Sequence, residues 1–162
     1  MHDIIKNKQP QYKWLGDLYK RSKKMKKIIT NHSNTGGLFR THSKLELLKI
    51  AKARFASYYF TFRHLLKVRE SLASMVSSPH WQVLKERATN AADKWGFELV
   101  EEAALDGMFW ARVRQVLDFT KPIYHMIQFA DTNKPVIGKV YEQMNTMLGQ
   151  MKDIVHKNDP DL

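Results

Sequence analysis

Cationic side chains crowd one short stretch of this chain, and their chemistry is that of a surface that binds polyanions. Six of them fall within residues 20–27: Lys20, Arg21, Lys23, Lys24, Lys26 and Lys27. A dense cationic strip neutralises phosphate groups and releases their counterions, which favours binding. The same run fits a short nuclear-import signal, and a solvated helix face with no ligand is the third interpretation. All three interpretations fit the run itself.

The charge of the whole chain is distributed unevenly, and this favours the first two interpretations. The net charge is +11, yet residues 1–80 hold 17 Lys and Arg against 4 Asp and Glu, while residues 81–162 hold 10 against 12. The basic half is therefore 1–80, and 81–162 is close to neutral. Nucleic acid and an anionic membrane surface both attract such a half, and composition does not choose between them.

Carboxylates and histidines show no arrangement typical of catalysis or metal binding. Glu98, Glu101 and Glu102 lie within two helical turns, where a solvated helix face is the better interpretation. The seven histidines have no cysteine partners and no HExxH pairing. The sequence also has no glycine-rich loop of the P-loop or dinucleotide-binding type. We therefore expect no catalytic residue, no metal site and no cofactor.

The composition is typical of a folded intracellular protein. Apolar residues make up 43% of the chain and charged residues 27%, which is ordinary for a globular domain. No apolar run approaches the roughly 20 residues that span a bilayer, so we expect no membrane partner. The absence of cysteine suits a reducing compartment.

Apolar residues recur at three-and-four spacing through most of the chain, which predicts an all-α protein. We expect an antiparallel helical bundle of about five to six helices that forms a single domain over residues 1–162. The predicted helical segments are 11–32, 43–50, 54–76, 80–94, 106–129 and 135–157. Between them, the glycine-rich stretch 31–37 predicts a loop, and residues 95–97 predict a break.

The last predicted helix, 135–157, has a seam of apolar residues spaced like a heptad repeat. Its members are Ile137, Tyr141, Met144, Leu148, Met151 and Val155. Such a seam is typical of a helix that packs on another helix. It predicts a homo-oligomer through this helix, or a fragment that interacts with proteins and has no nucleic-acid role.

Five short stretches resemble a known family. They are 40–49 (RTHSKLELLK), 53–57 (ARFAS), 119–124 (FTKPIY), 129–135 (FADTNKP) and 138–142 (GKVYE). Together they resemble part of a plant hAT-type transposase, over most of the chain from about residue 38 onward. The matching part of such transposases is a helical region inserted into a ribonuclease-H-like sheet that carries three acidic catalytic residues. The resemblance therefore implies a nuclear, DNA-handling segment with no active site.

The resemblance also suggests individual DNA-binding residues. Arg54 and Phe55 correspond to an Arg-Trp pair that lies near the flipped base at the transposon end, where an aromatic ring stacks on an unpaired base. Phe55 replaces the Trp and Ala53 replaces the usual Thr, and packing of Phe55 in the protein core is the alternative. Arg63 and Lys67 continue a cationic face along the same predicted helix.

Several parts of the family protein are missing from this sequence. A Cys-x-x-His stretch, an N-terminal zinc finger and a C-terminal dimerisation segment have no counterpart here. The resemblance therefore implies a transposon remnant or partial gene product. Three hypotheses follow: a non-catalytic DNA-binding segment, a helical interaction fragment and, least favoured, an active nuclease.

Overall fold

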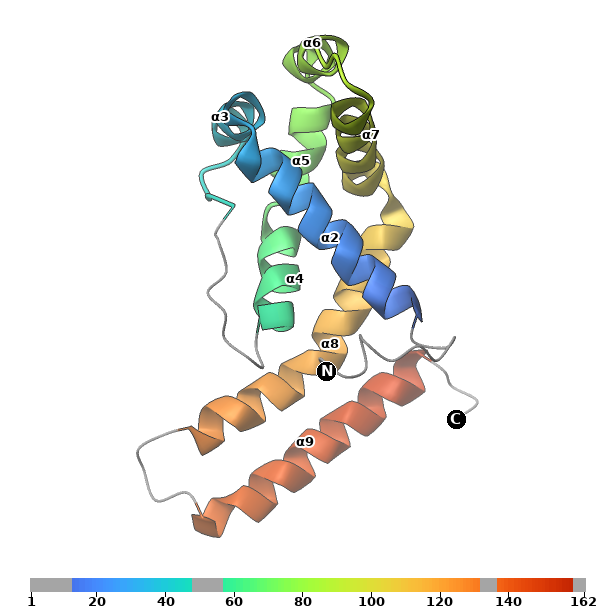
Figure 1. The fold of residues 1–162 in the computed structure, drawn as a ribbon. Helices are drawn as coiled ribbons and strands as arrows, with labels where there is room; N and C mark the ends of the chain where they lie inside the picture. The colour runs from blue at the N-terminus through green and yellow to red at the C-terminus, as the bar shows by residue number, and fades with distance from the viewer. Residues whose placement is uncertain (1–12, 48–56, 132–136, 159–162) are drawn as a thin grey trace. The chain divides into compact units, whose positions relative to one another are not determined.

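The computed structural model describes residues 13–47, 57–131 and 137–158, and every regular element among them is an α-helix (Figure 1). The helices are α2 (Lys13–Asn31), α3 (Ser33–His42), α4 (Ser57–Lys67), α5 (Arg69–Val76), α6 (Pro79–Glu86), α7 (Ala91–Leu105), α8 (Gly107–Ala130) and α9 (Ile137–Asn158). The predicted all-α class is thus confirmed for this part of the chain. The predicted number of five to six helices is wrong, because the described residues alone form eight.

The chain divides into two compact units, Met1–Val113 and Arg114–Leu162. Helix α8 begins in the first unit and continues into the second, where it contains Pro122. In the second unit, α9 runs in the direction opposite to the last part of α8 (Figure 1). Folding of residues 1–162 as one domain stays a prediction.

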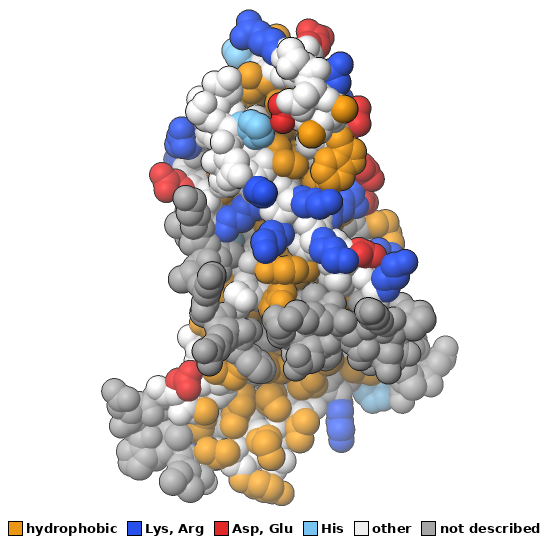
Figure 2. Space-filling model, in the orientation of Figure 1, with side chains coloured by type: hydrophobic (Ala, Val, Ile, Leu, Met, Phe, Trp, Pro, Cys, Tyr) orange, Lys and Arg blue, Asp and Glu red, His pale blue; other side chains and the backbone are white. Residues whose placement is uncertain are grey.

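Helix α2 lies across the first unit and contacts α3, α4 and α7. One face of α2 is buried, and the residues on it recur at helical spacing: Leu15, Leu18, Ser22, Met25 and Ile29. Burying a Leu, Ile or Met side chain stabilises a fold by roughly 1.5–3 kcal/mol, so this stripe fixes which way the helix faces. The opposite face carries lysines, and Figure 2 shows Lys and Arg side chains gathered over α2.

Helices α5 and α7 complete the core of this unit. Helix α5 contacts α3, α4, α6 and α7. Two tryptophans are fully buried here: Trp81 packs edge-on against Phe97 with centroids 4.9 Å apart, and the Trp110 indole N–H donates to the Ala104 carbonyl at 2.8 Å. The core is therefore aromatic at the α6–α7 side and anchored by a buried hydrogen bond at the start of α8.

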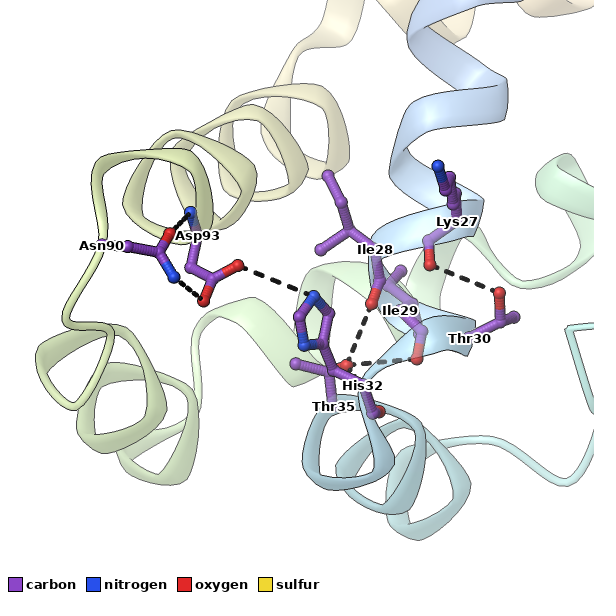
Figure 3. Close-up of polar contacts among 8 residues, drawn as sticks. All are labelled: Lys27, Ile28, Ile29, Thr30, His32, Thr35, Asn90 and Asp93. Atoms are coloured by element: carbon purple, nitrogen blue, oxygen red, sulfur yellow. Dashed lines mark hydrogen bonds and ion pairs between the residues drawn. The ribbon is translucent and has the colours of Figure 1, made fainter.

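The predicted loop at 31–37 is wrong, because α3 begins at Ser33, directly after α2 (Figure 3). The Thr35 hydroxyl lies 3.2 Å from the Ile28 carbonyl oxygen, 3.1 Å from that of Ile29 and 3.0 Å from that of His32. The buried Thr35 hydroxyl therefore donates to carbonyl oxygens at the end of α2, where the helix itself supplies no backbone donor. A Cβ on Gly36 would lie 3.2 Å from the Ile29 carbonyl oxygen, so the glycine permits close packing here.

The predicted helix 54–76 is wrong as a single element, because α4 ends at Lys67 and α5 begins at Arg69. The Val68 amide is shared between the carbonyl oxygens of His64 and Leu65, both at 3.2 Å. A shared amide of this kind tightens the last turn of a helix. Val68 is itself buried. Residues 54–56 lie outside the described part of the chain.

The predicted boundaries of helix 80–94 are also wrong, because its two halves belong to α6 and α7. Ser78 caps α6 by accepting from the Trp81 amide, and Asn90 caps α7 by accepting from the Asp93 amide at 2.7 Å. The predicted break at 95–97 lies inside α7. A Cβ on Gly96 would lie 3.4 Å from the Ile28 side chain, so this glycine marks close packing of α7 on α2 rather than a chain break.

The predicted helical segment 43–50 is wrong where the structure describes it. Ser43 has extended backbone angles and ends α3. Its hydroxyl donates to the Leu45 carbonyl and accepts from the Leu45 amide, which forms a local turn rather than the start of a helix. Residues 48–50 lie outside the described chain.

The predictions for the last two helices are confirmed to within two residues where they can be compared. The segment 106–129 is observed as α8 and the segment 135–157 as α9, with 135–136 outside the described residues. Among the helices described, none is long and apolar enough to span a membrane.

Candidate nucleic-acid interface

Four of the six cationic residues in 20–27 lie exposed on α2, away from its buried stripe. They are Lys20, Lys23, Lys24 and Lys27. Lys20 has a weak partner, since its Nζ lies 3.8 Å from an Asp17 carboxylate oxygen one turn earlier and both side chains are largely exposed. An exposed pair of this kind contributes little to stability. The four ammonium groups are therefore available to a polyanion.

Arg21 differs from these lysines, because its guanidinium is engaged inside the protein. One nitrogen lies 3.0 Å from an Asp106 carboxylate oxygen, another 3.0 Å from Glu102, and the group sits 5.3 Å from the centre of the Phe109 ring. Its side chain is only 27% exposed. Arg21 therefore links α2 to the α7–α8 junction.

Asp106 is the centre of that junction. Besides Arg21, its carboxylate accepts from the Met108 amide at 2.8 Å and so caps the start of α8. Burial alone would raise the pKa of Asp106, but hydrogen bonds from the Phe109 amide, the Arg21 side chain and the Met108 amide outweigh it, so the pKa lies below its usual value. The carboxylate thus stays charged, as its partners require.

Lys26 is half-buried on α2, and its charge acts on His64 of α4, as does the charge of Lys67. Burial lowers the pKa of Lys26. Burial also lowers the pKa of His64, the nearby charges of Lys26 and Lys67 lower it further, and a hydrogen bond to the Glu46 backbone opposes both. The buried His64 Nε2 has no hydrogen-bond partner within the described chain. Burial and the two nearby lysines thus favour the neutral form of His64.

The remaining predicted residues divide into two groups. Arg63 and Lys67 are exposed on α4, and the Arg63 guanidinium lies 6.0 Å from the centre of the Tyr59 ring. Arg54 and Phe55 lie outside the described residues, so their predicted role stays a prediction. The structure thus places Lys67 and Lys26 both near His64 and leaves Arg63 exposed on α4.

Trp95 is a residue of this surface that the sequence analysis missed. It lies on α7, its side chain is 49% exposed, and the Lys24 ammonium sits 4.5 Å from the ring centre. A signal was present in the sequence, because Phe97, Val100, Ala103 and Ala104 recur at helical spacing and Trp95 lies off that stripe. In the structure these four residues are buried together with Gly96. It was overlooked because residues 95–97 were interpreted as a break.

The three glutamates of α7 serve structure where they have partners. Glu101 accepts from Lys85 of α6 at 2.7 Å, and Glu102 pairs with Arg21. Glu98 is exposed. No group of three or more His, Asp or Glu side chains in the described ranges is arranged to hold a metal ion. The interpretation of these carboxylates as helix-surface residues is refined to two inter-helix ion pairs and one exposed group.

Comparison with protein-family models, with curated proteins and with solved structures gives no match to this chain. The cationic surface of α2 and its surroundings are the features of the described residues that bear on function.

Proposed function

We propose that this chain is a non-catalytic DNA-binding and DNA-positioning segment of a plant hAT-transposase-derived protein that acts in the nucleus as a transposon remnant. The observation that carries the proposal is the exposed face of α2. Lys20, Lys23, Lys24 and Lys27 project from it, opposite a buried apolar stripe. The fold therefore holds one side of the helix fixed and presents the lysines together.

The geometry of this lysine face suits a phosphate backbone better than a small anion. The four residues cover two turns of one helix, so their charges are spread along a line rather than converged on a point. Contacts of this kind fix position on DNA without reading its sequence. We therefore expect binding that depends on salt and only weakly on base sequence.

The family assignment is supported by the resemblance of residues 40–49, 53–57, 119–124, 129–135 and 138–142 to hAT transposases. In those proteins the catalytic carboxylates lie outside the corresponding helical region. The carboxylates described here are consistent with a non-catalytic segment, since Glu101 and Glu102 pair with cations of neighbouring helices.

Binding of a fluorescent hairpin duplex, measured by anisotropy, tests the proposal. We expect the wild-type chain to bind and a variant with Lys20, Lys23, Lys24 and Lys27 changed to Gln to bind at least tenfold more weakly, because each lost phosphate contact removes counterion release. The matched control removes the same charge elsewhere, through Arg112→Gln, Arg114→Gln, Lys139→Gln and Lys152→Gln, all at exposed positions. Equal loss in both variants would show that only net charge acts and would contradict a specific lysine face.

Assembly through α9 is a second candidate function, and the exposure of its predicted seam favours it. Tyr141 is 73% exposed, and Met144, Leu148 and Val155 are also exposed. Large apolar side chains repeated along one face of a helix are costly in water and pack well against a second helix. A second copy of this chain is the partner that offers the same seam.

Sedimentation velocity over a concentration series tests the second candidate. The wild-type chain should form a dimer, and a variant with Met144→Glu and Leu148→Glu should be a monomer because two buried carboxylates would face the partner seam. A control with Thr146→Glu and Gln150→Glu, off the seam, should remain dimeric. A wild-type chain that is monomeric throughout would contradict this candidate.

A further inference from the structure

The exposed indole of Trp95 is unlike the buried tryptophans described in the first unit. Trp81 and Trp110 have no exposed surface, whereas Trp95 is half-exposed on α7. A single exposed apolar residue needs no explanation by itself. Here, however, the ring lies beside the lysine face of α2, since the Lys24 ammonium sits 4.5 Å from its centre.

The packing of α7 on α2 fixes this arrangement. Gly96 lies against Ile28 of α2, and Trp95 is the residue before it. On α2, Lys20 and Lys27 are one turn before and after Lys24 and share its side of the helix. An aromatic ring therefore stands at the edge of a row of three exposed ammonium groups.

We propose that this surface takes single-stranded DNA, with an unpaired base stacked on Trp95 and the adjoining phosphates on Lys20, Lys24 and Lys27. The inference rests on the proposed DNA-binding function and specifies its ligand. An aromatic ring beside a cationic track is the arrangement by which proteins bind single strands without sequence preference. A duplex keeps its base faces stacked, so it gains nothing from the ring.

Lys24 occupies one side of the ring when DNA is absent, and the energetics favour its displacement. An exposed cation–π contact is worth about a 2- to 5-fold change in an equilibrium. Stacking of one base on an aromatic side chain is worth roughly 5- to 150-fold in affinity. Because the lysine side chain is flexible, its ammonium can move from the ring to a phosphate when the base enters.

Glu98 lies one turn after Trp95 on α7 and is exposed, so its carboxylate opposes a phosphate at this edge. Glu98→Gln should therefore strengthen binding of single-stranded and duplex DNA alike, by a few-fold at low salt. Lys94, next to Trp95 and also exposed, acts in the opposite direction.

The test compares an oligo(dT) strand with a blunt-ended linear duplex of equal phosphate number, by anisotropy at fixed salt. Trp95→Ala should weaken oligo(dT) binding at least 5-fold and leave duplex binding within 2-fold. Trp95→Phe should retain most of the oligo(dT) affinity, because a smaller ring still stacks. Leu105→Ala, which truncates another exposed apolar residue of α7, is the control and should change neither. Circular dichroism confirms that each variant is folded.

The outcomes separate this inference from the function on which it rests. If Trp95→Ala binds oligo(dT) like the wild type while the four-lysine variant loses both ligands, the inference is overturned and the DNA-binding function stands. Equal loss of both ligands in Trp95→Ala would also overturn it, because the ring would then act only by positioning Lys24. If the four-lysine variant keeps both ligands, the proposed function itself fails.

Discussion

At the scale of single residues, neighbouring cationic side chains in the sequence have different roles in the fold. Lys20 and Arg21 are adjacent, yet Lys20 is largely exposed and Arg21 is enclosed by Glu102, Asp106 and Phe109. The difference follows from helical geometry, because a step of one residue turns a side chain by about 100°. A cationic run on a helix therefore divides into residues that are exposed to solvent and residues that pair with other parts of the protein.

The protonation of His64, which lies near Lys26 and Lys67, should affect the free energy of unfolding near neutral pH. Its pKa in the folded protein is lowered, first by burial and then by Lys26 and Lys67. The unfolded state therefore binds the proton more readily than the folded state. The contribution of His64 to the free energy of unfolding is fully present above the unfolded pKa of about 6.5 and is lost as pH falls through the folded pKa.

Urea unfolding across this range measures the effect. The free energy of unfolding of the wild type should decrease between about pH 7.5 and about pH 5, and His64→Gln, which does not titrate, should show a shallower decrease. His80→Gln is the control, since that side chain is exposed on α6. If His64→Gln has the same pH dependence as the wild type, burial and the charges of Lys26 and Lys67 do not lower the pKa of His64 as described.

At the scale of helices, the space around a glycine determines whether a larger side chain fits there, and this space differs between neighbouring glycines. In α3, a Cβ on Gly36 would meet the Ile29 carbonyl oxygen at 3.2 Å, whereas a Cβ on Gly37 would meet nothing within 4 Å. Because the neighbour of Gly36 is backbone rather than a flexible side chain, it cannot easily move aside.

This contrast predicts opposite effects from the same substitution one residue apart. Gly37→Ala should raise the free energy of unfolding by up to about 1 kcal/mol through helix propensity. Gly36→Ala should leave the protein at least about 1 kcal/mol less stable than Gly37→Ala, because crowding offsets that gain. Chemical denaturation of the two variants measures the difference. Equal stabilisation by both substitutions would contradict the close packing of α3 on the end of α2.

The sequence predicted those helices well whose boundaries depend on local signals. Apolar spacing and flanking residues located α2, α8 and α9 to within about two residues. Three other features leave no mark on the spacing of apolar residues. The Thr35 hydroxyl donates to carbonyl oxygens at the end of α2, Gly96 packs on Ile28, and the Val68 amide is shared between two carbonyl oxygens. Periodicity contains no information on such contacts, so a loop, a break and an uninterrupted helix were predicted in their place.

Only part of the candidate site could be predicted from the sequence. The lysine run is visible in the sequence, but the engagement of Arg21 and the exposure of Trp95 depend on how α7 and α8 pack against α2. Trp95 lies about seventy residues from Lys24 in the chain, so only the fold brings the ring to the lysines.

At the scale of the whole molecule, the uneven charge distribution is expressed in part on one exposed surface. The excess of cations lies in residues 1–80, and part of it is collected on the outer face of α2 (Figure 2). We propose that Lys20, Lys23, Lys24 and Lys27 contact DNA phosphates. A general attraction of a basic protein for a polyanion would not need these four residues.

The most direct test is the salt dependence of hairpin-duplex binding, compared between the wild type and the variant with these four lysines changed to Gln. Each phosphate contact contributes about 0.9 to the slope of log affinity against log salt concentration. We expect the slope of the four-lysine variant to be shallower by roughly 3 to 4, and the variant neutralised at Arg112, Arg114, Lys139 and Lys152 to keep nearly the wild-type slope. Identical slopes for the wild type and the four-lysine variant would contradict this expectation.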